Sequence, residues 1–251
     1  MNEAAASLDG KPIRLTGGPR ALVFLHGFTC SPKTVLPVAE ELARAGFTLS
    51  LPLLPGSGTT PEDLASHSSR DWLDAAVAAW DELARTHPRP AVAGLSMGGA
   101  LALHVASVRP VSAVVALSPA LYLRDWRQSF LPVLAWLGLW REAGKTDVKV
   151  RQFEDPCYSR HAMKSLMDLR QVMAAAREAL PRITAPLLTI QAQEDHVIPP
   201  DCMDYCYRHA GSAVKEKHRL TDSYHVITLD QEYLTVAGHM RRFLSAHLPQ
   251  A

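Results

Sequence analysis

A serine between two glycines is the strongest candidate for chemistry in this sequence. The run 91–95 is apolar, and the residues that follow from position 100 to 106 favour a helix. Between them, Gly94, Ser96 and Gly98 form a Gly-x-Ser-x-Gly pattern, which predicts a buried strand, a sharp turn and a helix. Glycine is needed two residues before and after because a side chain there would collide with the neighbouring strand and helix. The pattern therefore indicates that Ser96 is a nucleophile; a serine that only caps the helix is the alternative.

A serine hydroxyl is a poor nucleophile at neutral pH, so it requires a base and an acid that orients the base. In an open parallel sheet the site lies at the carboxyl ends of the strands, which favours histidines in loops that follow strands. His225 lies in such a loop, before the last expected helix, and is the predicted base. His196 is the alternative base, whereas His26 is expected to shape the turn that contains it.

The predicted acid is Asp195, in the loop after the expected strand 187–192, with Glu194 and Asp222 as alternatives. The chain order is then nucleophile, acid, histidine. That order distinguishes serine hydrolases built on a strand, turn and helix from the other serine hydrolase architectures.

Acyl transfer to serine also needs two donors for the oxyanion, each worth about 3 to 4 kcal/mol. The backbone N–H of Met97, the residue after the nucleophile, is one candidate, and that of Phe28 in the turn after the first apolar strand is the other. Their side chains would then face the acyl group, so both are predicted to bind substrate. The alternative is that both are simply core residues.

Strands and helices alternate on either side of these motifs. This alternation predicts an α/β fold with a mostly parallel open sheet flanked by helices, in a single domain over residues 1–251. The expected strands are 21–26, 47–52, 91–95, 111–117, 186–192 and 214–220, the last of them charged and near the sheet edge, and the expected helices are 38–44, 71–85, 100–106, 200–209 and 230–247.

The alternation breaks between about residues 121 and 181. No convincing strand is seen there, only helix-like segments separated by proline and glycine, so this stretch is predicted to be a helical cap inserted in the domain. Its most apolar run, 130–140, is far shorter than the ~20 residues that a membrane-spanning helix needs, and no stable membrane insertion is expected.

Composition excludes several classes of protein. The chain has 26 Lys and Arg against 25 Asp and Glu, so no overall field would hold nucleic acid or an anionic membrane. A small, uncharged partner is expected. The N-terminus lacks the pattern of a secretory signal, and the four scattered cysteines suit a reducing compartment, so the expected location is cytoplasmic. Cys202 and Cys206 are expected to be two buried thiols rather than part of a zinc site.

Four segments together resemble a known family. They are 26–29, 94–99, 193–198 and 223–230, and they are similar to the small bacterial carboxylesterases of the α/β-hydrolase fold, close to the monoacylglycerol-lipase-like esterases. The similarity extends over nearly the whole chain from Leu22, and the His-Val-Ile-Thr-Leu-Asp run that begins at His225 is its most specific part.

The resemblance implies a cytoplasmic serine esterase for short- to medium-chain esters, with no metal or organic cofactor. It also implies that apolar residues of the cap line the acyl pocket, although packing of the cap on the core explains each of them equally well. Contact of these residues with lipid or a second subunit is a further alternative. The residues are Phe130, Leu131, Leu134, Trp136, Leu137 and Trp140.

Three departures from the family pattern concern the shape of the substrate. The chain has Ser57 between two glycines where relatives usually have histidine, Tyr224 where a glycine commonly precedes the histidine, and Cys30 where a glycine often follows Phe-Thr.

Other functions remain as alternatives. The same three residues could support acyl transfer or perhydrolysis, and a non-catalytic ligand-binding protein could share the fold. A peptidase is disfavoured because the cap shows no acidic cluster for a free amino terminus. A dehalogenase or epoxide hydrolase would need an aspartate in place of Ser96.

Overall fold

A computed structural model describes residues 10–123 and 131–248, apart from the side chain of Leu131. It shows a seven-stranded sheet in the order β1-β3-β2-β4-β5-β8-β9, in which only the β1–β3 pair is antiparallel. The strands are β1 (Ile13–Leu15), β2 (Ala21–Leu25), β3 (Thr48–Leu51), β4 (Ala91–Leu95), β5 (Val114–Leu117), β8 (Leu187–Ala192) and β9 (Lys215–Leu220). All six predicted strands are present, and the charged one is at the edge. Only β1 of this sheet was not predicted, because three residues are too few for a periodic signal.

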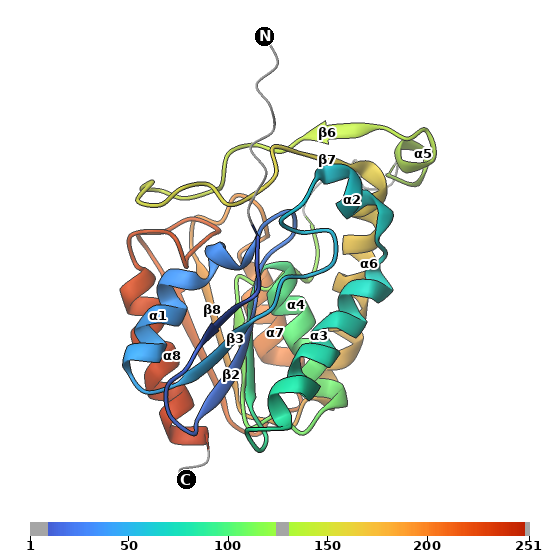
Figure 1. Cartoon of the computed structure of the whole chain (residues 1–251). Coiled ribbons are helices and arrows are strands. Elements are labelled where there is room, and N and C mark those ends of the chain that lie inside the picture. The colour runs from blue at the N-terminus through green and yellow to red at the C-terminus, as the bar shows by residue number, and fades with distance from the viewer. Residues whose placement is uncertain (1–9, 124–130, 249–251) are drawn as a thin grey trace.

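Helices cover both faces of the sheet (Figure 1). One layer contains α1 (Leu36–Arg44) and α8 (Tyr233–His247), and the other contains α3 (Ser69–Ala84), α4 (Met97–Val108), α6 (Met163–Ala179) and α7 (Asp201–His209). Three short helical segments lie in the connections between these strands and helices: α2 (Pro61–Ser66) and the 3-10 turns Pro32–Thr34 and Leu180–Arg182. The predicted α/β class, with a mostly parallel open sheet flanked by helices, is confirmed.

The central strands explain why the loops at one edge of the sheet converge. Every residue of β2, β4, β5 and β8 is buried, as expected for parallel strands covered on both faces. Their carboxyl ends lie close together at one edge, since Leu25 pairs with Gly94 and Leu117 pairs with both Leu95 and Ile190. The loops that leave these strands therefore begin side by side.

The insertion between β5 and β8 differs from the prediction. It contains α5 (Leu131–Trp136) and then two short strands, β6 (Trp140–Glu142) and β7 (Arg160–Ala162), which pair antiparallel above the carboxyl edge of the sheet (Figure 1). The expectation of helices alone was wrong because three-residue strands carry too little alternation to be recognised. The last helix of this stretch, α6, packs against α4 as part of the core layer.

The state of the four cysteines agrees only in part with the prediction. Cys30 and Cys157 form a disulfide, which removes the argument that the scattered cysteines suit a reducing compartment. Cys202 and Cys206 are buried and free, as predicted.

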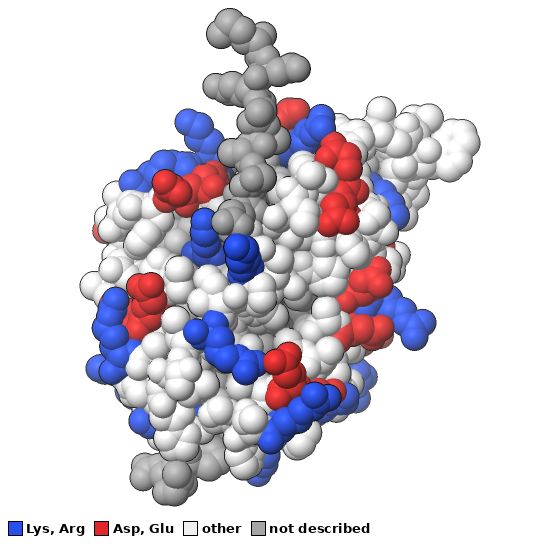
Figure 2. All heavy atoms as spheres, in the orientation of Figure 1, with Lys and Arg blue, Asp and Glu red and all other residues white. Residues whose placement is uncertain are grey.

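Charges of both signs are interspersed over the face seen in Figure 2. Among residues 10–123 and 131–248, no helix is both long and apolar enough to cross a membrane.

Candidate active site

The turn between β4 and α4 holds Ser96 in a strained backbone conformation, with φ 57° and ψ −115°. A Cβ at Gly94 would lie 2.0 Å from the Gly98 carbonyl oxygen, and one at Gly98 would lie 2.2 Å from the Leu25 carbonyl oxygen. Real Cβ atoms do not approach backbone so closely, so both positions require glycine. The strained turn directs the Ser96 hydroxyl into the cavity at the carboxyl edge of the sheet.

His225 and Asp195 complete a hydrogen-bonded chain with this serine. His225 Nε2 lies 2.9 Å from Ser96 Oγ, and His225 Nδ1 lies 2.8 Å from Asp195 Oδ2. A neutral imidazole protonated at Nδ1 satisfies both bonds, since it donates to the carboxylate and accepts from the serine hydroxyl. The structure thus brings together the three residues predicted as nucleophile, base and acid, from the loops after β4, β9 and β8.

Asp195 is held on both of its oxygens. Oδ1 accepts the N–H groups of Val197 and Ile198 at 3.0 and 2.8 Å, while Gln191 Nε2 donates to Oδ2 at 3.1 Å. Burial alone would raise the pKa of Asp195, but the His225 charge and these hydrogen bonds outweigh it and lower that pKa. The carboxylate is therefore ionised and fixed in orientation. Glu194, the alternative acid, is exposed beside it.

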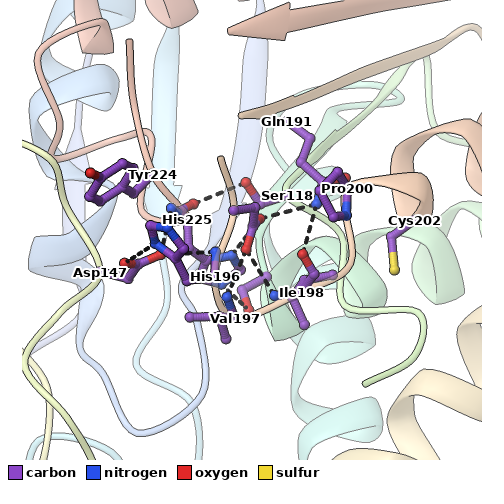
Figure 3. Close-up of polar contacts among 12 residues, drawn as sticks. Ser118, Asp147, Gln191, His196, Val197, Ile198, Pro200, Cys202, Tyr224 and His225 are labelled. Carbon is purple, nitrogen blue, oxygen red and sulfur yellow. Dashed lines mark hydrogen bonds and ion pairs between the residues drawn. The ribbon is translucent and has the colours of Figure 1, made fainter. Parts of the chain in front are cut away.

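The insertion contributes a second carboxylate. Asp147 Oδ2 accepts the backbone N–H of His225 at 3.1 Å, and Asp147 Oδ1 lies 3.0 Å from His196 Nδ1 (Figure 3). Burial opposes the charged form of His225, yet Asp195 and Asp147 together raise the pKa of His225 above its usual value. His196, the alternative base, contacts this carboxylate, and His225 is the histidine bonded to Ser96.

Two further groups fix the His225 loop. Ser118 Oγ donates to the His225 carbonyl oxygen at 3.0 Å (Figure 3). The fully buried carboxylate of Asp230 joins the loop to the insertion by accepting four backbone N–H groups. Their donors are Lys149, Val150, Tyr224 and Gln231.

The turn after β2 lies against the nucleophile. His26 accepts the Leu54 N–H at Nε2 (3.1 Å), and its Nδ1 lies 2.9 Å from the Gly27 carbonyl oxygen. Burial lowers the pKa of His26 to about 4, so it is neutral and shapes this turn, as predicted. A Cβ on Gly27 would lie 3.7 Å from Ser96 Cβ, so the turn that contains Gly27 and Phe28 lies next to the serine at Gly27. Met97 begins α4, where backbone N–H groups have no intrahelical acceptor.

Ser96 and His225 open into a cavity of about 570 Å³. Phe28 lines it, whereas Met97, 1% exposed, packs in the core and is not among the described lining residues. The remaining walls are partly apolar and partly polar. Apolar lining comes from Leu95, Ala120, Leu123, Leu166, Leu169, Met173 and Ile198, and polar lining from Arg141, Glu142, Lys145, Thr146, Asp147, Tyr158 and His161.

The described side chains among the cap residues predicted for the acyl pocket do not line the cavity. Leu134 and Trp136 are not among the described lining residues, and Trp136 is 84% exposed. The side chain of Leu131, and all of Phe130, fall outside the described residues. An exposed apolar side chain such as Trp136 is typical of a contact surface, which is the alternative given above for these cap residues.

Sequence reasoning missed several residues of the site. Gln191 could have been noticed as a polar residue in a fully buried strand. Asp147, His161 and the Cys30–Cys157 bond carry no local pattern, because their roles come from segments distant in the sequence. Within the described residues, no group of three or more His, Cys, Asp or Glu could hold a metal ion.

Comparisons with known proteins agree with this geometry. A thermostable monoacylglycerol lipase of Bacillus sp. (strain H-257) is 31% identical over 98% of this chain and 99% of its own length. A carboxylesterase of Bacillus subtilis (strain 168) is 26% identical over 93% of this chain and 96% of its own. A solved structure from work on LipS and LipT, two metagenome-derived lipolytic enzymes, superposes with a TM-score of 0.91. It is 32% identical in sequence, and the match covers 95% of this chain and 98% of that chain.

A family model also matches most of the chain. Residues 19–232 fit the Hydrolase_4 family, described as serine aminopeptidase, S33. The match covers the nucleophile turn, Asp195 and His225, which form the hydrogen-bonded chain. The protein therefore belongs to this family of α/β-hydrolase-fold serine hydrolases.

Proposed function

We propose that the protein is a serine carboxylesterase that hydrolyses short- to medium-chain carboxylic esters, monoacylglycerols among them. The observation that carries the proposal is the continuous hydrogen-bonded chain from Ser96 through His225 to Asp195, which ends in a cavity. The names of the two curated relatives, a monoacylglycerol lipase and a carboxylesterase, support the same chemistry.

In the proposed reaction, Ser96 Oγ attacks the ester carbonyl carbon while His225 Nε2 takes the hydroxyl proton. Asp195 stabilises the imidazolium that forms. The backbone N–H groups of Phe28 and Met97 donate to the oxyanion of the tetrahedral intermediate. His225 then protonates the leaving alcohol, and an acyl-serine remains.

Water completes the cycle. His225 removes a proton from a water molecule, the resulting hydroxide attacks the acyl-serine, and the carboxylic acid leaves as Ser96 regains its proton. The reaction needs no metal or organic cofactor. An acyltransferase or perhydrolase would share every step except the last, in which another nucleophile would replace water.

The cavity supports a small ester as the substrate. Its volume of about 570 Å³ lies within the range typical of small-molecule sites. The apolar side chains of α6 that face it, Leu166, Leu169 and Met173, provide a surface on which an alkyl chain would be buried.

The test is hydrolysis of p-nitrophenyl esters from two to twelve carbons by the wild-type protein and by Ser96→Ala. We expect a chain-length optimum for the wild type and a fall of at least about 10⁴-fold in kcat for the variant, with an unchanged circular dichroism spectrum. Comparable activity in Ser96→Ala, or an inert wild type, would overturn the proposal.

The family description makes aminopeptidase activity the natural comparison. Amino-acid p-nitroanilides measured beside the esters address it directly, and the proposal requires a kcat/KM for esters well above that for anilides. Adding an alcohol or hydrogen peroxide as competing nucleophile distinguishes hydrolysis from acyl transfer and perhydrolysis by the product formed.

A further inference from the structure

A buried histidine in the cavity has a hydrogen-bonding capacity that the fold does not use. His161, in β7, lines the cavity and is only 9% exposed. Neither of its ring nitrogens has a hydrogen-bond partner among residues 10–123 and 131–248. A buried polar group without a partner costs about 1 to 3 kcal/mol, and native structures rarely keep one without a reason.

The protonation state of His161 defines what could bind it. Burial, and then the positive charge of Arg141, lower the pKa of His161 to about 4, so the ring is neutral at pH 7. A neutral imidazole offers one N–H donor and one acceptor nitrogen. A hydroxyl group can pair with either nitrogen because it both donates and accepts. A carboxylate or an ammonium group could pair with only one of them.

The surroundings of His161 indicate which part of an ester would reach it. In the two-stranded sheet its Cα pairs with that of Arg141, so it belongs to the polar lining that the insertion provides. Its ring lies edge-on to Phe28, with the centroids 5.5 Å apart, next to the turn proposed to bind the oxyanion. The alkyl chain is expected on the apolar wall of α6, which leaves the alcohol group for the polar side.

We propose that His161 is a specificity-determining residue that binds a free hydroxyl on the alcohol group of the ester. The enzyme would then favour monoesters of polyols over esters of plain alkyl alcohols. This inference rests on the proposed esterase function and concerns the same cavity.

Two octanoate esters test the proposal directly. Glyceryl monooctanoate and propyl octanoate have the same acyl chain and a three-carbon alcohol, and differ only in two hydroxyls. The quantity measured is the ratio of their kcat/KM values, for the wild type, His161→Phe and His161→Gln.

We expect the wild type to favour the glycerol ester and His161→Phe to lower the ratio about three- to tenfold, the effect of one neutral hydrogen bond. Gln donates and accepts like the neutral ring, so His161→Gln should keep part of the preference. His209→Phe, the same replacement at an exposed histidine, should leave the ratio unchanged.

The proposal is overturned if the wild type shows no preference, or if His161→Phe hydrolyses both esters with the wild-type ratio. Should His161→Phe fail to fold, the wild-type preference and its partial retention in His161→Gln decide the matter. A wild type inert on both octanoates and on p-nitrophenyl esters would instead overturn the esterase function itself.

Discussion

Every residue of β2 and β4 is buried in the sheet, whereas every residue of β6 in the insertion is exposed. The sheet positions Ser96 through close backbone packing, in which Gly98 meets the Leu25 carbonyl. The insertion has no such packing around β6. It reaches the site through a few specific contacts, among them a disulfide and the carboxylate of Asp147.

This difference separates two tasks. The rigid edge of the sheet holds the nucleophile and the acid, whose geometry must be accurate to fractions of an ångström. The insertion supplies the polar wall of the cavity and one of the groups that hold the His225 loop. Substitutions in the loops of the sheet should therefore abolish activity or folding, whereas substitutions in the insertion should change activity or stability by smaller amounts.

The largest effect is expected from Asp195→Asn. The amide would favour the wrong tautomer of His225, so kcat/KM should fall about 10³- to 10⁴-fold while the fold is kept. Ester hydrolysis measures kcat/KM, and circular dichroism checks that the fold is kept. Glu194→Gln, at the exposed neighbour, is the matched control and should keep nearly full activity. The reverse result would move the acid to Glu194.

Breaking the disulfide tests how far the insertion depends on it. Cys30 and Cys157 are 127 residues apart, and closing so long a loop restricts the unfolded chain strongly. We expect Cys157→Ser to lower the free energy of unfolding by about 2 to 4 kcal/mol in urea denaturation. A reductant should destabilise the wild type and leave Cys157→Ser unaffected. Equal sensitivity of the two proteins would contradict the bond.

A pair of glycine substitutions compares the two regions by the same chemical change. Gly98→Ala forces a Cβ to within 2.2 Å of backbone and should cost about 1 to 3 kcal/mol of stability, together with most of the activity. Gly144 has nothing within 4 Å of its Cβ position, so Gly144→Ala should change stability by less than about 0.5 kcal/mol. Thermal unfolding gives both values. Similar losses would show that the insertion is packed as closely as the core.

The smallest effect is expected from Asp147→Asn. Asparagine can still accept the His225 N–H, so kcat/KM at the optimum should fall only about three- to tenfold. Activity requires neutral His225, and kcat/KM rises as pH increases through the pKa of His225. Asp147 helps to raise that pKa, so the acidic limb of the pH profile should move to lower pH in the variant.

The control for this shift is Asp222→Asn. Asp222 is an exposed carboxylate in the His225 loop, paired with Lys149, and it does not contribute to the raised pKa of His225. Its removal should leave the limb in place. A limb that moves equally in both variants would point to overall charge rather than to Asp147.

Much of the fold was predictable because its signals are local. Mainly apolar runs predicted five of the seven strands of the main sheet, a short charged segment was predicted as the strand at its edge, and the glycines around Ser96 predicted the nucleophile turn. Position relative to these strands was enough to select Asp195 and His225, which lie within hydrogen-bond distance of each other. The strands β1, β6 and β7 were missed because a three-residue strand has no periodicity of its own.

By itself, the sequence determined the layered α/β architecture, the strained serine turn and the order of the residues proposed for catalysis, since each follows from periodicity or from glycine at fixed spacing. Only the tertiary structure decided which insertion residues reach the site. Asp147 meets His225, Cys157 meets Cys30, and His161 enters the cavity. These contacts join segments far apart in the chain, and their geometry depends on how the insertion folds back over the sheet, which no local pattern of residues encodes.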